Sequence, residues 1–406
     1  MRILIVNKSD SEGGAARAAM RLHKALLKAG VDSKFLVWDK NSLEPEVHEI
    51  AKPLEKIFFK IMTKISFAKF VRLNGNFSSP SWYKTILSSR IRSFKPDIIH
   101  IHWLGSGLLS FAEFRSVETP IFWTLHDEWL HTAGCHYSMG CEKYVEGCFE
   151  CPLLKQKFNF ISIEKLFYKR KIDFFNSKSN NTVVALSSWI KSQAERSKIF
   201  RDTKIIGLPN PIDFLEFTNI QLESAREILQ LPKLDQIVLF GAMNGDSDPR
   251  KGFIYLEKAL CKLNNIKICV FGSGDKGKVS FGNGYYDFGL ITDQQLLNNL
   301  YNAANVFVAP SLHENLANSI MEALVCGTPV VAFDIGGNAD MIIHKVNGYL
   351  VKPYSTEDLA FGINWCLTNV KNDLKTKERI RKTMETYKDN NIASRYIEEY
   401  RLNLWK

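Results

Sequence analysis

The chain has 406 residues, 45% of them hydrophobic and 24% charged, which is the balance of a soluble globular protein. This length exceeds one ordinary core, so we expect two domains. The net charge of +10 favours anionic partners such as phosphates, acidic lipid headgroups or nucleic acids. We expect no transmembrane helix, because no run of about 18 apolar residues occurs, and MRILIVN at the start is typical of a strand rather than a secretory signal.

Short apolar runs alternate with segments of helical periodicity. The runs that we interpret as strands are 3–6, 35–38, 98–103, 121–125 and 182–186, then 237–242, 266–272, 305–311 and 329–334. Because the runs are apolar throughout, they are typical of parallel strands buried on both faces. Two such series separated by helices predict two doubly wound α/β domains.

Two prolines in LPNPID (208–213) interrupt regular structure and mark the boundary between the domains. We therefore predict one domain over residues 1–207 and a second over residues 208–385. Residues 386–406 should form a charged helix, whose apolar stripe is expected to pack back on the first domain.

The loop after the first predicted strand carries Gly13 and Gly14, with Arg17 close behind. It lacks a full GxGxxG, so a dinucleotide fingerprint is not supported. A small loop at a helix start can still contact phosphate or let an acceptor approach, which makes Gly14 and Arg17 candidate substrate-binding residues.

Residues 52–72 are basic and rich in Phe and Ile. Lys52, Lys56, Lys60 and Lys64 recur every four positions and so line one side of a helix. A basic amphipathic helix with aromatic residues suits an anionic membrane surface. The alternative is an ordinary core helix with a solvated face.

His126 and Asp127 directly follow the predicted strand 121–125, at the sheet edge where α/β proteins bind ligands. The alternative is a His–Asp pair that caps the next segment. His100 and His102 share one face of the strand 98–103, and we expect one or both to reach the same region.

Cys135, Cys141, Cys148 and Cys151 form C-x5-C-x6-C-x2-C. Only the last pair has zinc-knuckle spacing. Without an export signal we expect reduced thiols and prefer a structural zinc site, with disulfides or simple packing as alternatives. A nearby histidine, His131 or His136, could replace one ligand.

Arg250 and Lys251 lie beside a predicted helix start, after the strand 237–242 and a polar loop. Two cations there can neutralise a leaving diphosphate, unless they belong to a solvated basic loop. Gly272 and Gly274 end the next strand, where glycines let a backbone approach a ligand or simply form a tight turn.

Glu314 and Glu322 flank the start of another predicted helix. Backbone N–H groups at a helix start suit a phosphate, and carboxylates accept hydrogen bonds from paired hydroxyls, so together they describe a sugar nucleotide. The alternative is two solvated glutamates on a surface helix. The candidate contacts to diphosphate and sugar are Asn315, Leu316, Ala317, Asn318 and Ser319.

The pattern Glu314-x7-Glu322 followed by GTPVVAFDIGG resembles the donor site of the retaining glycosyltransferases of family 4. The glycine loop, His126, the PN-x-ID linker and Lys251-Gly252 fall in the same order as in that family, so the resemblance spans nearly the whole chain. It implies a GT-B fold, with two Rossmann-like domains facing each other across a cleft. The N-terminal domain, which includes the loop 135–151, would bind the acceptor and the C-terminal domain the nucleotide sugar.

The resemblance also implies residue roles. Glu322 would bind both ribose hydroxyls, Glu314 would face the transferred sugar and His126 would touch it. Two positions depart from the family: Asn315 stands where Gly is common and Ala242 where an Arg is usual. We infer that Arg250 supplies the missing charge.

The sequence thus predicts a retaining glycosyltransferase whose catalytic residues are His126, Arg250, Lys251 and Glu314 and which needs no catalytic cofactor. The donor would be a UDP- or GDP-sugar. The acceptor would be a saccharide, specifically a lipid-linked oligosaccharide of a bacterial surface polysaccharide, and the protein would be cytoplasmic and peripheral on the inner membrane face. The alternatives are a GT-B nucleotide-sugar epimerase and a zinc-containing nucleic-acid-binding protein. The scattered basic residues count against nucleic acid.

Overall fold

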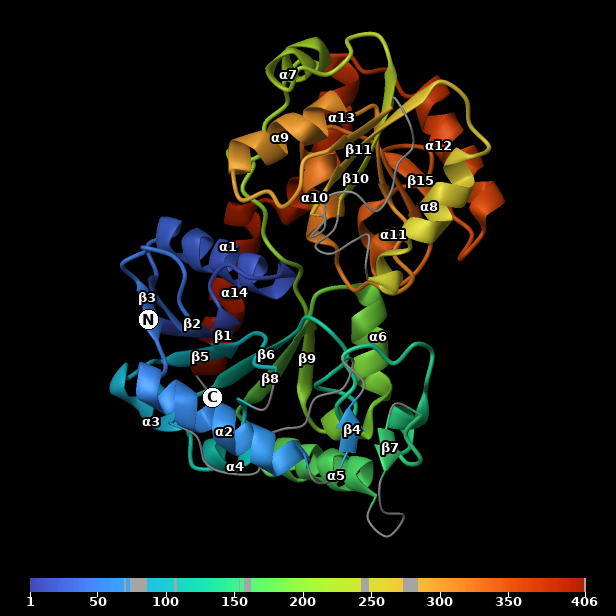
Figure 1. Ribbon diagram of the computed structural model, residues 1–406. Coiled ribbons are helices and arrows are strands. Elements are labelled where there is room, and N and C mark those ends of the chain that lie inside the picture. Colours follow the sequence, from blue (N-terminus) through green and yellow to red (C-terminus); the bar gives the residue numbers. More distant parts are fainter. Residues whose placement is uncertain are drawn as a thin grey trace. The chain divides into compact units, whose positions relative to one another are not determined.

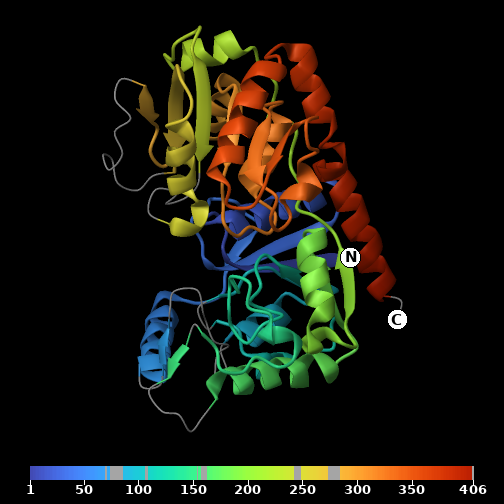
Figure 2. The same ribbon diagram turned by 90° about the vertical axis from the view of Figure 1, so that its right-hand side faces the viewer.

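The computed structural model describes residues 1–68, 71–73, 86–105, 108–152, 154–156, 162–241, 248–272 and 284–404. The chain forms two compact units (Figures 1 and 2). The first comprises Met1–Pro211 and Ile392–Lys406, and the second comprises Ile212–Asn391. The change from one unit to the other thus falls inside the LPNPID segment, and the C-terminal residues belong to the first unit.

The first unit is built on a parallel sheet of order β3-β2-β1-β5-β6-β8-β9. Its strands are β1 (Arg2–Ser9), β2 (Asp32–Asp39), β3 (Val47–Glu49), β5 (Ile98–Ile101), β6 (Ile121–Leu125), β8 (Asn181–Ala185) and β9 (Lys204–Gly207). Every residue of β5, β6 and β8 is buried, as the apolar runs predicted. The chain order reverses between β1 and β5, and the carboxyl ends of these strands are where such sheets bind ligands.

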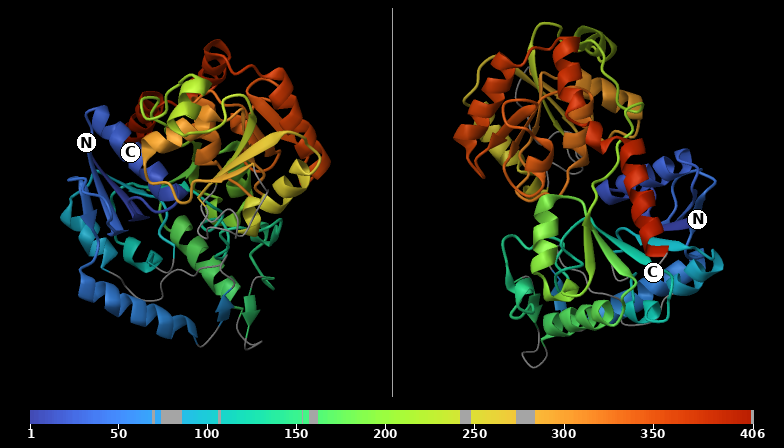
Figure 3. Two further views of the ribbon diagram at one scale, coloured as in Figure 1. Left: turned by 45° about the horizontal axis from the view of Figure 1, so that its top comes forward. Right: turned by 180° about the vertical axis from the view of Figure 1, so that it is seen from behind.

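Helices cover both faces of this sheet (Figure 3). They are α1 (Gly14–Lys28), α2 (Pro53–Ala68), α3 (Leu87–Ser93), α4 (Phe111–Phe114), α5 (Ile163–Asn176), α6 (Ser188–Arg196) and α14 (Asp389–Leu404). The unit also contains the 3-10 turns η1 (Lys143–Val145) and η2 (Lys198–Phe200). A separate antiparallel pair is formed by β4 (Val71–Leu73) and β7 (Leu154–Gln156). Alternate residues of β1 divide between two cores, because successive strand side chains point to opposite faces. Leu4 and Val6 pack with α3 to α6, whereas Ile3 and Ile5 pack with α1 and α14.

The second unit has a parallel sheet of order β12-β11-β10-β13-β14-β15. Its strands are β10 (Gln236–Gly241), β11 (Ile266–Phe271), β12 (Tyr285–Asp287), β13 (Val306–Ala309), β14 (Val330–Phe333) and β15 (Gly348–Val351). Its helices are α7 (Leu222–Ile228), α8 (Phe253–Leu260), α9 (Gln294–Ala303), α10 (Asn318–Val325), α11 (Asn338–Met341), α12 (Thr356–Asn369) and α13 (Leu374–Lys382), with 3-10 turns η3 (Pro249–Lys251) and η4 (Glu385–Tyr387). One core joins α8 and α12 to the sheet. The turn η3 and the start of α10 both follow strands at its carboxyl edge.

Within the described ranges, no helix combines the length and the hydropathy needed to cross a membrane. The C-terminal stripe buries Tyr396 and Tyr400 of α14 in the core beside α1. Trp405, Ala242 and Gly274 lie outside the described residues.

Candidate active site

Two glycines let neighbouring loops approach the segment between β13 and α10. Gly252 has φ of 69° and Gly336 has φ of 54°, a region that residues with a side chain rarely adopt. A Cβ on Gly252 would collide with the carbonyl oxygen of Pro310, and a Cβ on Gly336 with that of Glu314. The Leu312 N–H also donates to the Arg250 carbonyl at 2.7 Å. The two glycines therefore allow Lys251 and Glu314 to come together.

Lys251 and Glu314 form an ion pair, with 2.9 Å between Nζ and Oε2. Their side chains are only 26% and 19% exposed. Burial alone would raise the pKa of Glu314, but the pKa is lowered overall because the Lys251 ammonium, His313 and the Asn315 N–H stabilise the carboxylate. Glu314 is therefore ionised at neutral pH and partly balances the charge of Lys251.

Arg250 is held by a partner that the sequence did not reveal. Its guanidinium donates from Nε and Nη2 to the two carboxylate oxygens of Asp248, at 3.1 and 2.5 Å, and Asp248 also accepts the Arg250 N–H. A bidentate contact of this kind fixes the plane of the guanidinium. The positive charge predicted at Arg250 is thus present at η3, oriented by a neighbouring carboxylate.

Glu322 lies on α10 and is only 2% exposed. The hydroxyl of Tyr301, on α9, donates to its Oε2 at 2.9 Å. The Tyr301 ring is itself fixed by an edge contact to Phe271, at the end of β11, with ring centroids 5.8 Å apart. Such a buried and oriented carboxylate does not fit the alternative of a solvated glutamate on a surface helix.

The start of α10 is shaped for close approach. Asn315, Leu316 and Ala317 are buried, and Asn318 and Ser319 are partly exposed. The N-cap residue is Ala317, whose methyl group cannot compete with an anion for the N–H groups of the first turn. At the end of β11, Gly272 has φ of 85° and its N–H donates to the Gly289 carbonyl, which follows β12, at 2.7 Å. Substrate binding by Gly272 stays a prediction.

In the first unit, three histidines meet beside β6. His102 Nδ1 and His126 Nε2 are 2.8 Å apart, so one proton is shared between them. Burial lowers the pKa of His126 to about 4, of His100 to about 3 and of His102 well below its usual value. All three imidazoles are therefore neutral at pH 7.

His100 and His102 do different things. His100 bridges Thr124 Oγ1, at 2.7 Å, and the Tyr400 hydroxyl of α14, at 2.6 Å. His102 contacts His126, and its Nε2 is buried without a hydrogen-bond partner among the described residues. It lines a cavity of about 30 Å³ together with His126 and Trp103. His102 thus reaches the region of His126, whereas His100 fastens α14 to the sheet.

Asp127 is occupied by contacts within the first unit. It accepts hydrogen bonds from Trp103 Nε1 at 2.8 Å, His136 Nδ1 at 2.7 Å and the Trp129 N–H at 2.9 Å. Burial alone would raise its pKa, but the pKa is lowered because His136 and these N–H groups stabilise the charge. The bond to the Trp129 N–H is the capping contact that we considered as the alternative. Substrate binding by Asp127 stays a prediction.

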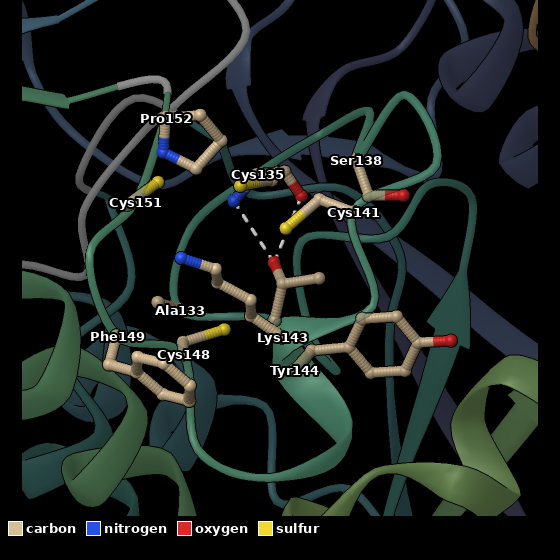
Figure 4. Close-up of a pocket in the computed structure, with 11 residues that line it drawn as sticks. Ala133, Cys135, Ser138, Cys141, Lys143, Tyr144, Cys148, Phe149, Cys151 and Pro152 are labelled. Carbon is tan, nitrogen blue, oxygen red and sulfur yellow. Dashed lines mark hydrogen bonds between the residues drawn. The ribbon is translucent and has the colours of Figure 1, made fainter.

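Gly14 and Arg17 lie on the exposed first turn of α1, where Gly13 has φ of 89° and the Arg17 N–H donates to its carbonyl at 3.2 Å. Cys135, Cys141, Cys148 and Cys151 are not joined in disulfides, and they line one small cavity (Figure 4). As the side chains stand, no group of three or more His, Cys, Asp or Glu residues in the described part of the chain is placed to hold a metal ion.

Two family models match the chain. The model described as "Glycosyltransferase Family 4" matches residues 12–214, and that described as "Glycosyl transferases group 1" matches residues 235–369. The chain belongs to glycosyltransferase family 4. It is therefore a transferase, which decides against the nucleic-acid-binding alternative.

Relatives of this family 4 glycosyltransferase include the putative colanic acid biosynthesis glycosyl transferase WcaC of Escherichia coli K12. The two are 25% identical over 352 residues, or 82% of this chain and 83% of WcaC. The putative teichuronic acid biosynthesis glycosyltransferase TuaC of Bacillus subtilis is 25% identical over 67% of this chain and 61% of its own length. Among solved structures, sucrose-phosphate synthase of Thermosynechococcus elongatus is similar in fold, with a TM-score of 0.71 and 20% sequence identity. The superposition covers 99% of this chain and 98% of the synthase chain. The fold is GT-B.

In this family 4 enzyme the structure brings Lys251, Glu314 and the start of α10 to one edge of the second sheet. Sequence reasoning missed Asp248 and Tyr301, which orient Arg250 and Glu322. Asp248 lies two residues before Arg250, so an Asp-x-Arg spacing was a usable signal. Tyr301 lies 21 positions before Glu322 in sequence, and no local pattern links the two.

Proposed function

We propose that this family 4 enzyme transfers a sugar from a UDP- or GDP-sugar to a saccharide, with retention of configuration, in the synthesis of a bacterial surface polysaccharide. The observation that carries the proposal is the Lys251–Glu314 pair beside the helix that bears Glu322. The names of the relatives support the pathway, since WcaC is named for colanic acid and TuaC for teichuronic acid. The acceptor that we propose is a lipid-linked oligosaccharide at the cytoplasmic face of the membrane.

The donor would be held by the second unit. Glu322, oriented by Tyr301, accepts hydrogen bonds from the two ribose hydroxyls through its carboxylate oxygens. The first turn of α10 directs its N–H groups and the positive end of the helix dipole at the diphosphate. Asn315, in place of a glycine, adds a side chain near the sugar and thereby narrows the choice of donor.

The proposed reaction breaks the bond between the anomeric carbon and the diphosphate oxygen and forms a bond from the acceptor oxygen on the same face. The acceptor proton passes to the departing diphosphate, so charge and atoms balance without an enzymic nucleophile. Lys251, with Arg250, offsets the charge that develops on the diphosphate. His126 is neutral because burial lowers its pKa, so it serves as a hydrogen-bonding group to the sugar rather than as a cation.

Calorimetry with UDP-, GDP- and ADP-sugars tests the donor site. Wild-type protein should bind one donor class, and Glu322→Ala should weaken that binding about tenfold or more, because a charged hydrogen-bond partner is worth about 1.5–3 kcal/mol. The control is Glu227→Ala, a glutamate of α7 that lies at the surface in an ion pair with Lys233. Equal affinity of wild type and Glu322→Ala would reject the ribose assignment. The anomeric coupling constant of the product, measured by NMR, decides between retention and inversion.

Helix α2 supports the proposal that the enzyme docks on an anionic membrane. Leu54, Ile57, Phe58 and Ile61, spaced as one helical stripe, are 80%, 55%, 63% and 51% exposed. Phe59 anchors the helix against Trp38, with ring centroids 4.8 Å apart. An ordinary core helix would turn polar residues outward, whereas this one exposes an apolar stripe on a basic segment, which suits a lipid interface.

Sedimentation with phosphatidylcholine vesicles, with and without phosphatidylglycerol, tests the docking. The variant Leu54→Ser/Phe58→Ser should lose most binding to the anionic vesicles, because a buried apolar side chain contributes about 1.5–3 kcal/mol. The control is Leu234→Ser, which removes a 98%-exposed leucine from the second unit. Equal binding by the double variant and the control would show that α2 is not the docking surface.

A further inference from the structure

The four cysteines of the loop 135–151 line a single cavity of about 20 Å³, the size of one small atom or ion. Figure 4 shows their sulfurs around it, together with Ala133 and Lys143. The Cys135 thiol hydrogen-bonds to that of Cys151, and Cys148 lies close enough to influence both. Half of the eight cysteines of the chain therefore meet at one point of the fold.

The backbone of the loop turns sharply to present these thiols. The Cys141 N–H donates to the Ser138 carbonyl at 3.0 Å, and the Cys148 N–H donates to the Lys143 carbonyl at 2.8 Å. Cys148 and Glu150 have φ of 49° and 47°, a left-handed conformation that costs free energy for residues with a side chain. Simple packing of small apolar side chains would not require this geometry at C-x2-C.

We propose that the four thiols bind one zinc ion, as thiolates, at the centre of this cavity. Four sulfur ligands favour tetrahedral zinc over magnesium or calcium, which prefer oxygen. The four cysteines are not joined in disulfides and their present rotamers do not form a ligand set, so binding requires rotation of the cysteine side chains and releases the thiol protons to solvent. Lys171 of α5 lies fully buried near Cys135 and Cys148.

The zinc would brace the loop that follows His126. His136 and Ser138 lie between the first two cysteines; His136 Nδ1 bonds to Asp127 at 2.7 Å, and the Ser138 hydroxyl donates to Glu128 at 2.7 Å. Lys171 donates to the backbone carbonyls of Trp129 and Thr132. A metal that fixes Cys135 and Cys141 therefore fixes the partners of the two carboxylates next to His126. This role rests on the proposed function, whereas the zinc site does not.

The test starts from untagged, full-length protein purified without chelator. Zinc measured by mass spectrometry should be close to one per chain in wild type and absent in Cys141→Ser/Cys151→Ser. The matched control, Cys261→Ser, removes an exposed cysteine of the second unit and should keep its zinc. If the double variant does not fold, titration of wild type with a mercurial reagent in the presence of a zinc indicator should release one equivalent. Cobalt in place of zinc should give the sulfur-to-metal charge-transfer bands of a tetrahedral thiolate site.

Metal-free wild type whose intact mass lacks two or four hydrogens would overturn the proposal in favour of disulfides. Metal-free wild type with four free thiols, whose melting temperature does not rise when zinc is supplied, would overturn it in favour of packing. Removing zinc should lower turnover while leaving nucleotide-sugar affinity within about twofold of wild type, because the donor residues lie in the second unit. If zinc-loaded wild-type protein bound no nucleotide sugar, that result would instead count against the proposed function.

Discussion

Replacing Lys251 by methionine should separate two tasks of this lysine, pairing with Glu314 and stabilising the leaving diphosphate. The pair is 2.9 Å long and about three-quarters buried, which places it between exposed pairs, worth under about 1 kcal/mol, and buried pairs, whose disruption costs about 3–5 kcal/mol. We therefore expect Lys251→Met to lower the free energy of unfolding by about 2 kcal/mol. Loss of a charge that stabilises the transition state should lower kcat by roughly 100- to 1000-fold.

A double-mutant cycle with Glu314→Gln distinguishes the two tasks. In that background the cost of Lys251→Met in urea unfolding should fall close to zero, because the pair is already broken. Its cost in kcat should persist, because the diphosphate still lacks its counter-charge. Single-turnover assays of donor cleavage give the second quantity. If the loss of kcat also vanished in the Glu314→Gln background, Lys251 would act only by holding Glu314, and the reasoning would be refuted.

Three further outcomes are expected. Tyr301→Phe should weaken donor binding about tenfold in calorimetry, because Glu322 loses a hydrogen bond that orients its carboxylate; unchanged affinity would contradict this. Gly289→Ala should destabilise the protein by roughly 1 kcal/mol, because Gly289 has a positive φ, and Gly336→Ala should cost well over that amount. Both glycines have a positive φ, but only at Gly336 would the new Cβ collide with a carbonyl oxygen. Equal urea midpoints for the two variants would disprove the steric argument. In the unfolded state His126 takes up a proton below about pH 6.5, whereas in the folded state burial keeps it neutral until about pH 4. Between these two pH values the free energy of unfolding should therefore fall on acidification, by up to about 1.4 kcal/mol per pH unit for this histidine. His126→Asn should flatten the slope, and an equal slope would show that His126 does not report on folding.

The sequence predicted the sheets better than their edges. Every apolar run that we interpreted as a strand is one, because a strand buried on both faces must be apolar along its length. The edge strands of both sheets, β3, β9, β12 and β15, were missed, since each has only three or four residues and offers too short an apolar run to recognise. Whether a short segment forms an edge strand depends on the neighbouring strand with which it pairs, and the residues of the segment itself do not show this.

The candidate site shows a similar division. Glu314, Glu322 and Lys251 could be singled out because each lies beside a strand end or helix start that the pattern located. The partners of these residues could not be singled out from the sequence, since Tyr301 contacts Glu322 only after α9 and α10 have packed on the same sheet. The pairing of Lys251 with Glu314 across 63 positions depends on Gly252 and Gly336, whose effect is steric and appears only in three dimensions.

The return of α14 to the first unit constrains how the protein is made. Ile392, Tyr396 and Tyr400 of α14 complete a core whose other buried members lie between residues 3 and 208, and Tyr400 bonds to His100 across 300 positions. On the ribosome, the second unit has all of its residues before the first unit has its last helix. The sheet face that α14 covers therefore stays exposed until the chain is finished. In a chain that stops near residue 388 this face would remain exposed, and chaperones and proteases would bind it.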